Sequence, residues 1–239
     1  MPLHKLRRGV GARWVLVSST FTNQSNNNGD TSSIISLPSG ILAGDLLVAF
    51  VAHHVRRTSS WPAGWTEIAD DFASGTLGDG AASIGWRLAD GATDGTTVTV
   101  TSSDKTYSSG AVVQIRGADT TTPILELPAK AYSTGTTSHD PPAVSPSWGT
   151  AGHTFFINAA LGTFASGTSG TVDDVTSCTP GVGYNNLGYG YNDTGTGDQR
   201  TVAALAYKVA ISSIEDPAAW TILDDNMDIQ SYTIAVQPK

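Results

Sequence analysis

Short segments in which apolar and polar residues alternate recur along this chain, and they constrain its fold more than any other feature. In residues 81–89 (AASIGWRLA), Ala82, Ile84, Trp86 and Leu88 alternate with small or polar residues, as in a half-buried strand. Gly, Pro and Asn separate such segments, and we find no helical periodicity over about 12 residues. The pattern predicts an all-β fold with further strands at residues 14–18, 33–36, 45–52, 66–71, 96–102, 111–117, 153–162, 200–210, 220–223 and 231–238.

The two halves of the chain resemble each other. Trp86-Arg87 and Tyr207-Lys208 correspond at an offset of 207 − 86 = 121, and the alternating residues 111, 113 and 115 correspond to 232, 234 and 236 at the same offset. Trp65 corresponds to Tyr184 at 119, and AGDLLVAFVA (43–52) aligns with AGHTFFINAA (151–160) at 108. We expect duplicated halves (residues 37–124 and 145–239), packed as one β-sandwich over residues 14–239 with jelly-roll-like connections.

The charge is distributed unevenly. The chain has a net charge of −8, yet Lys5, Arg7, Arg8 and Arg13 lie in a first segment without acids, so the remainder carries −8 − 4 = −12. An acidic body repels nucleic acid. We therefore expect no nucleic-acid partner, and we interpret residues 1–13 as a basic arm that is either solvated or docked on another subunit.

Targeting signals are not evident in the sequence. Cys178 is the single cysteine, which excludes an intramolecular disulfide and a paired-cysteine metal site. Arg13 interrupts the first apolar run, and no apolar span of membrane length follows. These features predict a protein that is made in the cytoplasm and does not contact a membrane.

Two histidines and two arginines crowd the segment after residues 44–52: His53, His54, Arg56 and Arg57. Neighbouring side chains on a strand point to opposite faces, so the two histidines would hold a metal ion poorly. We expect a hairpin tip that is solvated or contacts an acidic neighbouring subunit, and we predict no metal or other cofactor.

Four other residues are predicted to be structural. Asp45 follows Gly44 at a turn and would accept backbone N–H bonds. Trp65, in a Pro-Ala-Gly-Trp turn, would close one end of the sandwich. Trp86 belongs to the alternating strand, and Arg116 would bind loop carbonyls or Asp119.

Two kinds of ligand site are alternatives to turn chemistry. The acid pairs 70–71, 173–174 and 224–225 and the acidic loops at 192–198 and 224–228 have the oxygen donors of calcium or glycosidase sites, without the spacing of an EF-hand loop. Tyr184, Tyr189 and Tyr191 lie in a Gly/Asn-rich segment (181–198) that is typical of recognition loops but also compatible with strands. No common catalytic motif is present, and we predict that the chain is not an enzyme.

Four short motifs occur in order: AGDLLVAFVA, PAGWTEI, a strand ending in WRLADG, and VVQIRGADTTTPI. Together they resemble a β-sandwich module of bacteriophage and prophage virion proteins, over residues 37–124, with an echo in AALAYKVA and YTIAVQP. The resemblance implies a structural virion protein, most simply a capsid decoration or cement protein. It would bind the major capsid protein or other virion subunits as a homo-oligomer, with a trimer favoured. The alternative is a carbohydrate- or receptor-binding module of a phage tail or fibre protein.

Overall fold

The computed structural model describes residues 15–23, 30–54, 56–72, 80–120, 125–127, 129–164, 178–192, 200–222, 227–237 and 239. Within these ranges every regular element is a strand, which confirms the predicted all-β class. The strands are β1 (Val15–Asn23), β2 (Asp30–Ser36), β3 (Leu46–His53), β4 (Ser59–Ser60), β5 (Thr66–Phe72), β6 (Ala81–Leu88), β7 (Thr97–Thr106), β8 (Ser108–Arg116), β9 (Leu125–Glu126), β10 (Lys130–Thr134), β11 (Ser138–His139), β12 (Thr154–Phe164), β13 (Cys178–Thr179), β14 (Asn185–Asn192), β15 (Thr201–Ala210), β16 (Trp220–Ile222) and β17 (Met227–Val236). In this part of the chain there is no helix that could span a membrane.

The strands form four antiparallel sheets, two in each half of the chain. The first half has a large sheet in the order β1-β8-β3-β6-β5 and a small sheet β2-β7-β4. The second half has a large sheet β10-β17-β12-β15-β14, with β9 beside β17, and a small sheet β11-β16-β13. If β10 is taken as the counterpart of β1, and so on in chain order, the two halves have the same strand order.

The halves also share an irregularity within a strand pair. The pairing of β5 with β6 shifts register between Glu67 and Ala69, and the pairing of β14 with β15 shifts between Asn186 and Gly188. These two bulges lie 119 residues apart, the offset expected from Trp65 and Tyr184. The shared bulge supports a duplication of the whole unit, because a bulge depends on local detail and not on the general strand pattern.

The alignment of the two AG-containing segments is wrong by one residue. Val48 pairs with Trp86 and Val113, and Ile157 occupies the same place between Tyr207 and Ile234. The offset is therefore 157 − 48 = 109 and not 108. A shift of one residue exchanges the two faces of a strand, so the expected alignment would have placed Phe156 in the position that Ile157 occupies.

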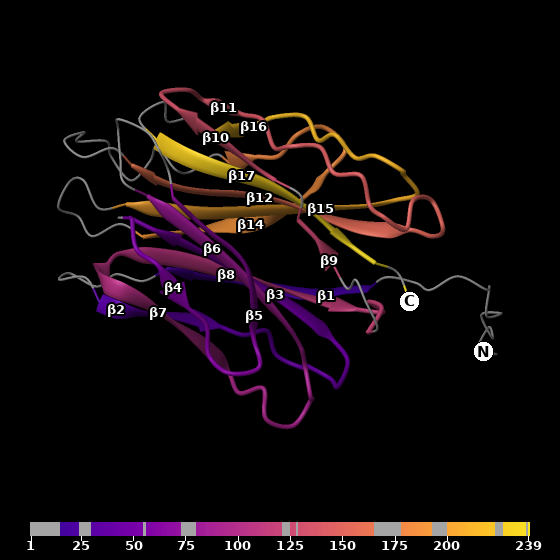
Figure 1. Ribbon diagram of the computed structural model, residues 1–239, viewed down its shortest axis with the longest axis horizontal. Helices are drawn as coiled ribbons and strands as arrows, with labels where there is room; N and C mark the ends of the chain where they lie inside the picture. Colours follow the sequence, from indigo (N-terminus) through magenta and orange to yellow (C-terminus); the bar gives the residue numbers. More distant parts are fainter. Residues whose placement is uncertain are drawn as a thin grey trace, which may run out of the picture.

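The four sheets stack as four layers, with the two large sheets in the middle (Figure 1). A shared core fills the space between the large sheets, where alternate residues of β3 (Leu46, Val48 and Phe50) meet those of β12 (Phe155 and Ile157). The opposite faces of the large sheets pack on the small sheets and form two private cores. Ile35, Val98 and Val100 belong to the first, and Trp220, Ile222 and Ile229 to the second.

The sandwich is thus confirmed, but its layering differs from the expected two sheets. Each half buries one face in its own small sandwich and the other face against its partner half. The jelly-roll-like description stays a prediction, because β5 and β14 lie at the edges of the large sheets and not in the small ones.

An approximate two-fold rotation relates the halves. β1 packs on β14, β3 packs on its own counterpart β12, and β5 contacts β10 through the Asp71–Lys130 ion pair. Reciprocal contacts of this kind are the mark of a two-fold dimer interface. Here the interface joins two parts of one chain.

Candidate functional site

Asp45 joins the first and last of the four sequence motifs. It is 1% exposed and lies directly after the Leu42–Gly44 turn, in which Gly44 has a φ of 85°. Arg116 donates from Nε to Oδ1 and from a terminal nitrogen to Oδ2, both at 2.7 Å. Gln114 donates to Oδ2 at 2.6 Å, and the backbone N–H of Leu42 donates at 2.9 Å.

This arrangement holds Asp45 as a carboxylate. Burial favours the neutral acid, but the hydrogen bonds from Arg116, Leu42 and Gln114 outweigh burial and lower the pKa of Asp45 below its ordinary value. A carboxylate with all of these donors is neither a proton donor nor a free base. Its role is to tie the turn at the start of β3 to the end of β8.

A pair of tryptophans covers the outer face of β6. Trp61 donates its indole N–H to Ser83 Oγ at 2.9 Å, and its ring lies against Gly85, where a Cβ would come within 2.6 Å of the ring. Trp65 stacks on Trp61 with the ring centroids 5.4 Å apart. Trp65 is half-buried against the first private core, so it covers an edge of the sandwich and is not a fully buried plug.

An ion pair occurs at equivalent places in the two halves. Arg87 binds Asp94 at 2.6 Å, and Lys208 binds Glu215 at 2.8 Å. Each carboxylate is about 5% exposed, and the offset is 121 for both members of the pair. The sequence aligns Arg87 with Lys208 at the offset of 121, but it did not lead us to their carboxylate partners Asp94 and Glu215. The neighbouring Trp86 is half-buried against the shared core.

The expectation that His53 contacts a partner is wrong. His53 is the last residue of β3 and is 0% exposed, with Nε2 3.2 Å from Ser59 Oγ. Burial lowers its pKa to about 4, which keeps the imidazole neutral. The strand extends one residue beyond the predicted end, so this side chain lies inside the molecule and not at the tip.

The other tip residues are less buried. His54 is half-buried and packs edge-on against Tyr107, with 6.2 Å between the ring centroids. Arg57 pairs with Asp104 at 3.3 Å and donates to the backbone carbonyl of Arg56 at 2.9 Å. Arg56 is exposed. The basic arm with Lys5, Arg7, Arg8 and Arg13 lies outside the described residues.

Part of the predicted recognition segment (181–198) is a strand, and residues 193–198 lie outside the described residues. Residues 185–192 form β14, the edge strand of the second large sheet. Tyr189 and Tyr191 lie on it with ring centroids 6.3 Å apart, and both pack against the second private core. Tyr184, in the turn before β14, has the ammonium group of Lys208 5.7 Å from its ring centroid. These rings are half-buried, so each offers part of its surface to a ligand.

Three acidic residues of the predicted ligand sites form hydrogen bonds within the protein. Asp70 accepts from the backbone N–H of Ser59 at 3.2 Å, Asp71 accepts from Tyr232 at 3.2 Å, and Asp228 accepts from Tyr132 at 2.6 Å. The pairs at 173–174 and 224–225 lie outside the described residues, as does most of each acidic loop. Among the residues that the structure places, no three His, Cys, Asp or Glu side chains gather as metal ligands. Burial raises the pKa of Cys178 to about 12, so its thiol is not a nucleophile at neutral pH.

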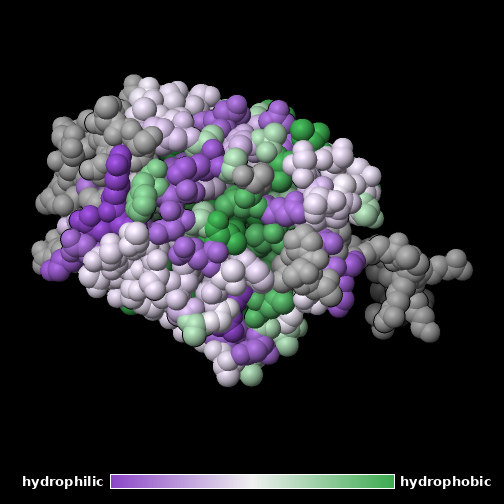
Figure 2. All heavy atoms as spheres, in the orientation of Figure 1, coloured by the Kyte–Doolittle hydropathy of each residue, from purple (hydrophilic) through white to green (hydrophobic). Residues whose placement is uncertain are grey.

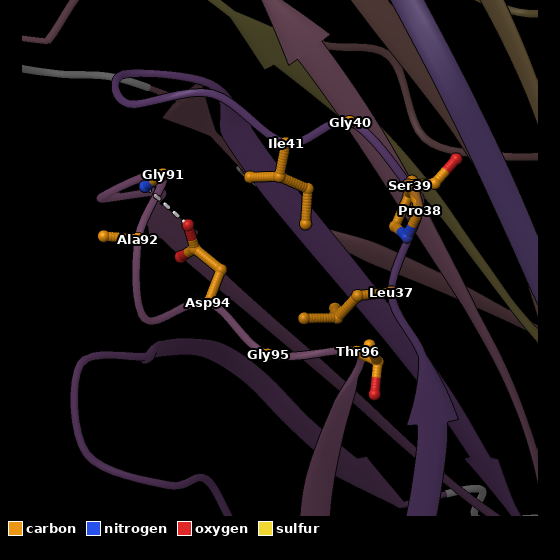
Figure 3. A pocket seen from close by; sticks show the side chains of 10 residues that line it. All are labelled: Leu37, Pro38, Ser39, Gly40, Ile41, Gly91, Ala92, Asp94, Gly95 and Thr96. Carbon is orange, nitrogen blue, oxygen red and sulfur yellow. Dashed lines mark hydrogen bonds between the residues drawn. The ribbon is translucent and has the colours of Figure 1, made fainter.

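A hollow of about 390 Å³ lies between the β2–β3 and β6–β7 loops (Figure 3). Leu37, Pro38 and Ile41 line one side, and Gly91, Ala92 and residues 94–96 line the other. The carboxylate of Asp94 faces Gly91 and accepts its N–H at 2.7 Å, while its other oxygen binds Arg87. That charge is therefore neutralised within the protein, and the lining of the hollow is mainly aliphatic and backbone, with the hydroxyl groups of Ser39 and Thr96.

Comparison with protein-family models, with curated proteins and with solved structures gives no match to this chain.

Proposed function

We propose that this chain is a structural bacteriophage virion protein, most simply a decoration or cement protein that binds the assembled head as an oligomer. The observation that carries the proposal is the Asp45–Arg116 ion pair. It joins the Gly-Asp-Leu-Leu and Arg-Gly-Ala-Asp motifs of the virion-module resemblance and gives both a structural role. The proposal assigns no catalytic step to the chain.

The mechanism that we propose is the addition of contact surface. A protein that bridges neighbouring capsid subunits over patches of standard size opposes their separation without chemistry. The four-layer body suits this task because its halves share one core and cannot move apart freely. The basic arm and the exposed Arg56 would meet acidic patches on the capsid or on another copy.

Removal of residues 1–13 tests the role of the arm. Heads that lack the protein would be incubated with the full chain or with the truncated chain and then sedimented. We expect the truncated chain to keep its β-sheet circular dichroism and to lose most of its occupancy on heads. Equal occupancy of the two proteins would contradict an anchoring role for the arm.

A glycan-binding function is the second candidate, and the neighbouring Tyr189 and Tyr191 rings on an edge strand favour it. Partly exposed aromatic rings can stack on sugars. The test is retention on immobilised host-surface polysaccharide. Retention that is lost in the Tyr189→Ala and Tyr191→Ala variants, without binding to heads, would replace the virion-decoration proposal with this one.

A further inference from the structure

Exposed aliphatic residues gather at one end of the second half. Val182 is 93% exposed, Val209 40%, and Ile211 and Ile214 are each 56% exposed. They are four of the seven large apolar residues that are exposed in the described part of the chain. We call these four residues the apolar end face. Exposed apolar patches mark interaction sites.

The local geometry brings the four residues to one end. Val209 lies near the end of β15, opposite Phe155, and Ile211 follows two residues later. Gly181 touches Ala218, so the turn that carries Val182 lies against the loop that follows Ile214. Figure 2 shows apolar residues at the upper right, over the loops of the second half, in addition to those along the seam between the halves.

Exposed carboxylates lie in the loops around the apolar end face. Asp140 and Asp216 are exposed in the same group of loops. The nearby cation of Lys208 is held by Glu215 at 2.8 Å. A partner that fits this surface is therefore aliphatic and basic.

The chain itself carries a segment with this chemistry. Residues 1–14 contain Leu3, Leu6, Val10 and Trp14 among the four cations of the basic arm, and they contain no acid. Fully extended, 14 residues reach about 46 Å, which is long enough to span from one molecule to a neighbour.

The arm begins at the same end of the molecule as the apolar end face. Asn192 pairs with Thr201 at the start of β15 and donates to the carbonyl of Ser108 at the start of β8. The packed strands β8 and β15 therefore run in the same direction and end together. Val15 pairs with Arg116, the last residue of β8, so β1 begins at the end of the molecule where β15 ends.

Pairing of edge strands is a poor alternative for contact between copies. The edge strands of the large sheets are β1, β5, β10 and β14. All but β10 have a register shift that disturbs the ladder, and β10 is short, with five residues. Bulged edges discourage strand addition from another chain. Association through exchanged arms needs no pairing of edge strands. Each copy has one arm and one apolar end face, so each copy can both give an arm and receive one.

We propose that residues 1–14 of a second copy bind the apolar end face, so that copies associate by exchange of their N-terminal arms. The proposal concerns contact between copies and stands whether or not the protein binds phage heads. Its failure would show in solution, whereas failure of the proposed function would show only on heads.

Light scattering after size-exclusion chromatography tests the exchange. We expect the full chain to have the mass of an oligomer, and both the truncation of residues 1–13 and Ile211→Asp to be folded monomers. A mixture of these two variants should form a complex, because one supplies an intact face and the other an intact arm. A monomeric full chain, or variants that keep the mass of the full chain, would overturn the proposal.

Disulfide trapping distinguishes contact between copies from contact within one chain. Protein with Leu6→Cys would be mixed with protein carrying Ile214→Cys and oxidised mildly, and linked peptides would be identified by mass spectrometry. The matched control replaces Ile214→Cys with Ile34→Cys, on the outer face of the first small sheet and 47% exposed. We expect the 6–214 link to exceed the 6–34 link several-fold. Equal yields of the two links would overturn the proposal. A chain carrying both Leu6→Cys and Ile214→Cys would also overturn it if residues 6 and 214 were linked only within one chain.

Discussion

Asp45 shows how this protein uses its charged residues. It is almost completely buried, but it receives four hydrogen bonds from three residues, one of which is a guanidinium group. Arg87 and Lys208 hold buried carboxylates in the same manner. At the scale of single residues, charge in the described part of the chain serves mainly to fasten loops to strands.

Asp45→Asn should lower the free energy of unfolding by about 2–4 kcal/mol. The amide keeps the shape of the side chain but leaves the partly exposed Arg116 without its anion. Urea unfolding at pH 7 measures the loss, with Asp216→Asn, an exposed carboxylate, as the control. A loss as small as that of the control would contradict the structural role of Asp45.

The buried histidines predict a stability that falls in mild acid. Burial lowers the pKa of both His53 and His139 to about 4, whereas an unfolded histidine has a pKa of about 6.5. Below pH 6.5 the unfolded chain gains protons that the folded chain refuses, so stability is complete above pH 6.5 and declines towards pH 4. We expect each histidine to contribute roughly 2 kcal/mol of this decline.

Urea unfolding at pH 7 and pH 4.5 measures this decline. His53→Asn should lose less free energy between the two pH values than the unaltered chain. Equal losses in the two proteins would show that His53 does not titrate as its burial requires.

The sequence predicts the kind of role that Asp45 and Arg116 have, but not their pairing. Turn chemistry identifies Asp45, yet the two residues are 71 positions apart, and alternation does not reveal which strands become neighbours. For His53 the limit is different. Strand ends are uncertain by a residue or more, and one residue decides whether this side chain is inside or outside.

At the scale of elements, Gly85 links β6 to the turn before β5. The ring of Trp61 occupies the space of the missing Cβ, and the counterpart of Gly85 in the second half is Ala206. Gly85→Ala should cost about 1–3 kcal/mol, because the Trp61 ring must move.

A double-mutant cycle with Trp61→Ala tests that explanation. Once the ring is removed, Gly85→Ala should cost much less than it does in the unaltered chain. Additive losses, measured by thermal unfolding, would mean that the alanine is disfavoured for a reason other than the ring.

The long strands could be predicted because alternation is visible in them, as in β6 and β7. β4, β9, β11 and β13 have two residues each, too few to show any period. For β14 the sequence left a strand and a recognition loop as alternatives, because glycines and a bulge interrupt its pattern and its Tyr/Asn/Gly composition is typical of loops.

At the scale of the whole molecule, the two halves behave as a dimer fused into one chain. The apolar faces predict that sheets must stack, but they do not show that each half has a second, private core. Only the strand pairing distinguishes a two-layer from a four-layer arrangement of sheets. The sequence does not, because residues buried on either face of a large sheet are of the same apolar types.

The shared core predicts that both halves unfold together. Ile35→Val in the first private core and Ile222→Val in the second should each cost about 0.5–1.5 kcal/mol. Each should lower the midpoint of one common transition in calorimetry, with equal calorimetric and van't Hoff enthalpies. Two separate transitions, each moved by one variant, would mean that the halves are independent domains.

We propose that this chain acts by binding to an assembled surface. Co-sedimentation of the purified full chain with phage heads that lack it tests the claim most directly. We predict saturable binding at a fixed number of copies per head and a higher temperature of head disruption. The contradicting result is a chain that stays in the supernatant at every concentration, with no change in the stability of the heads.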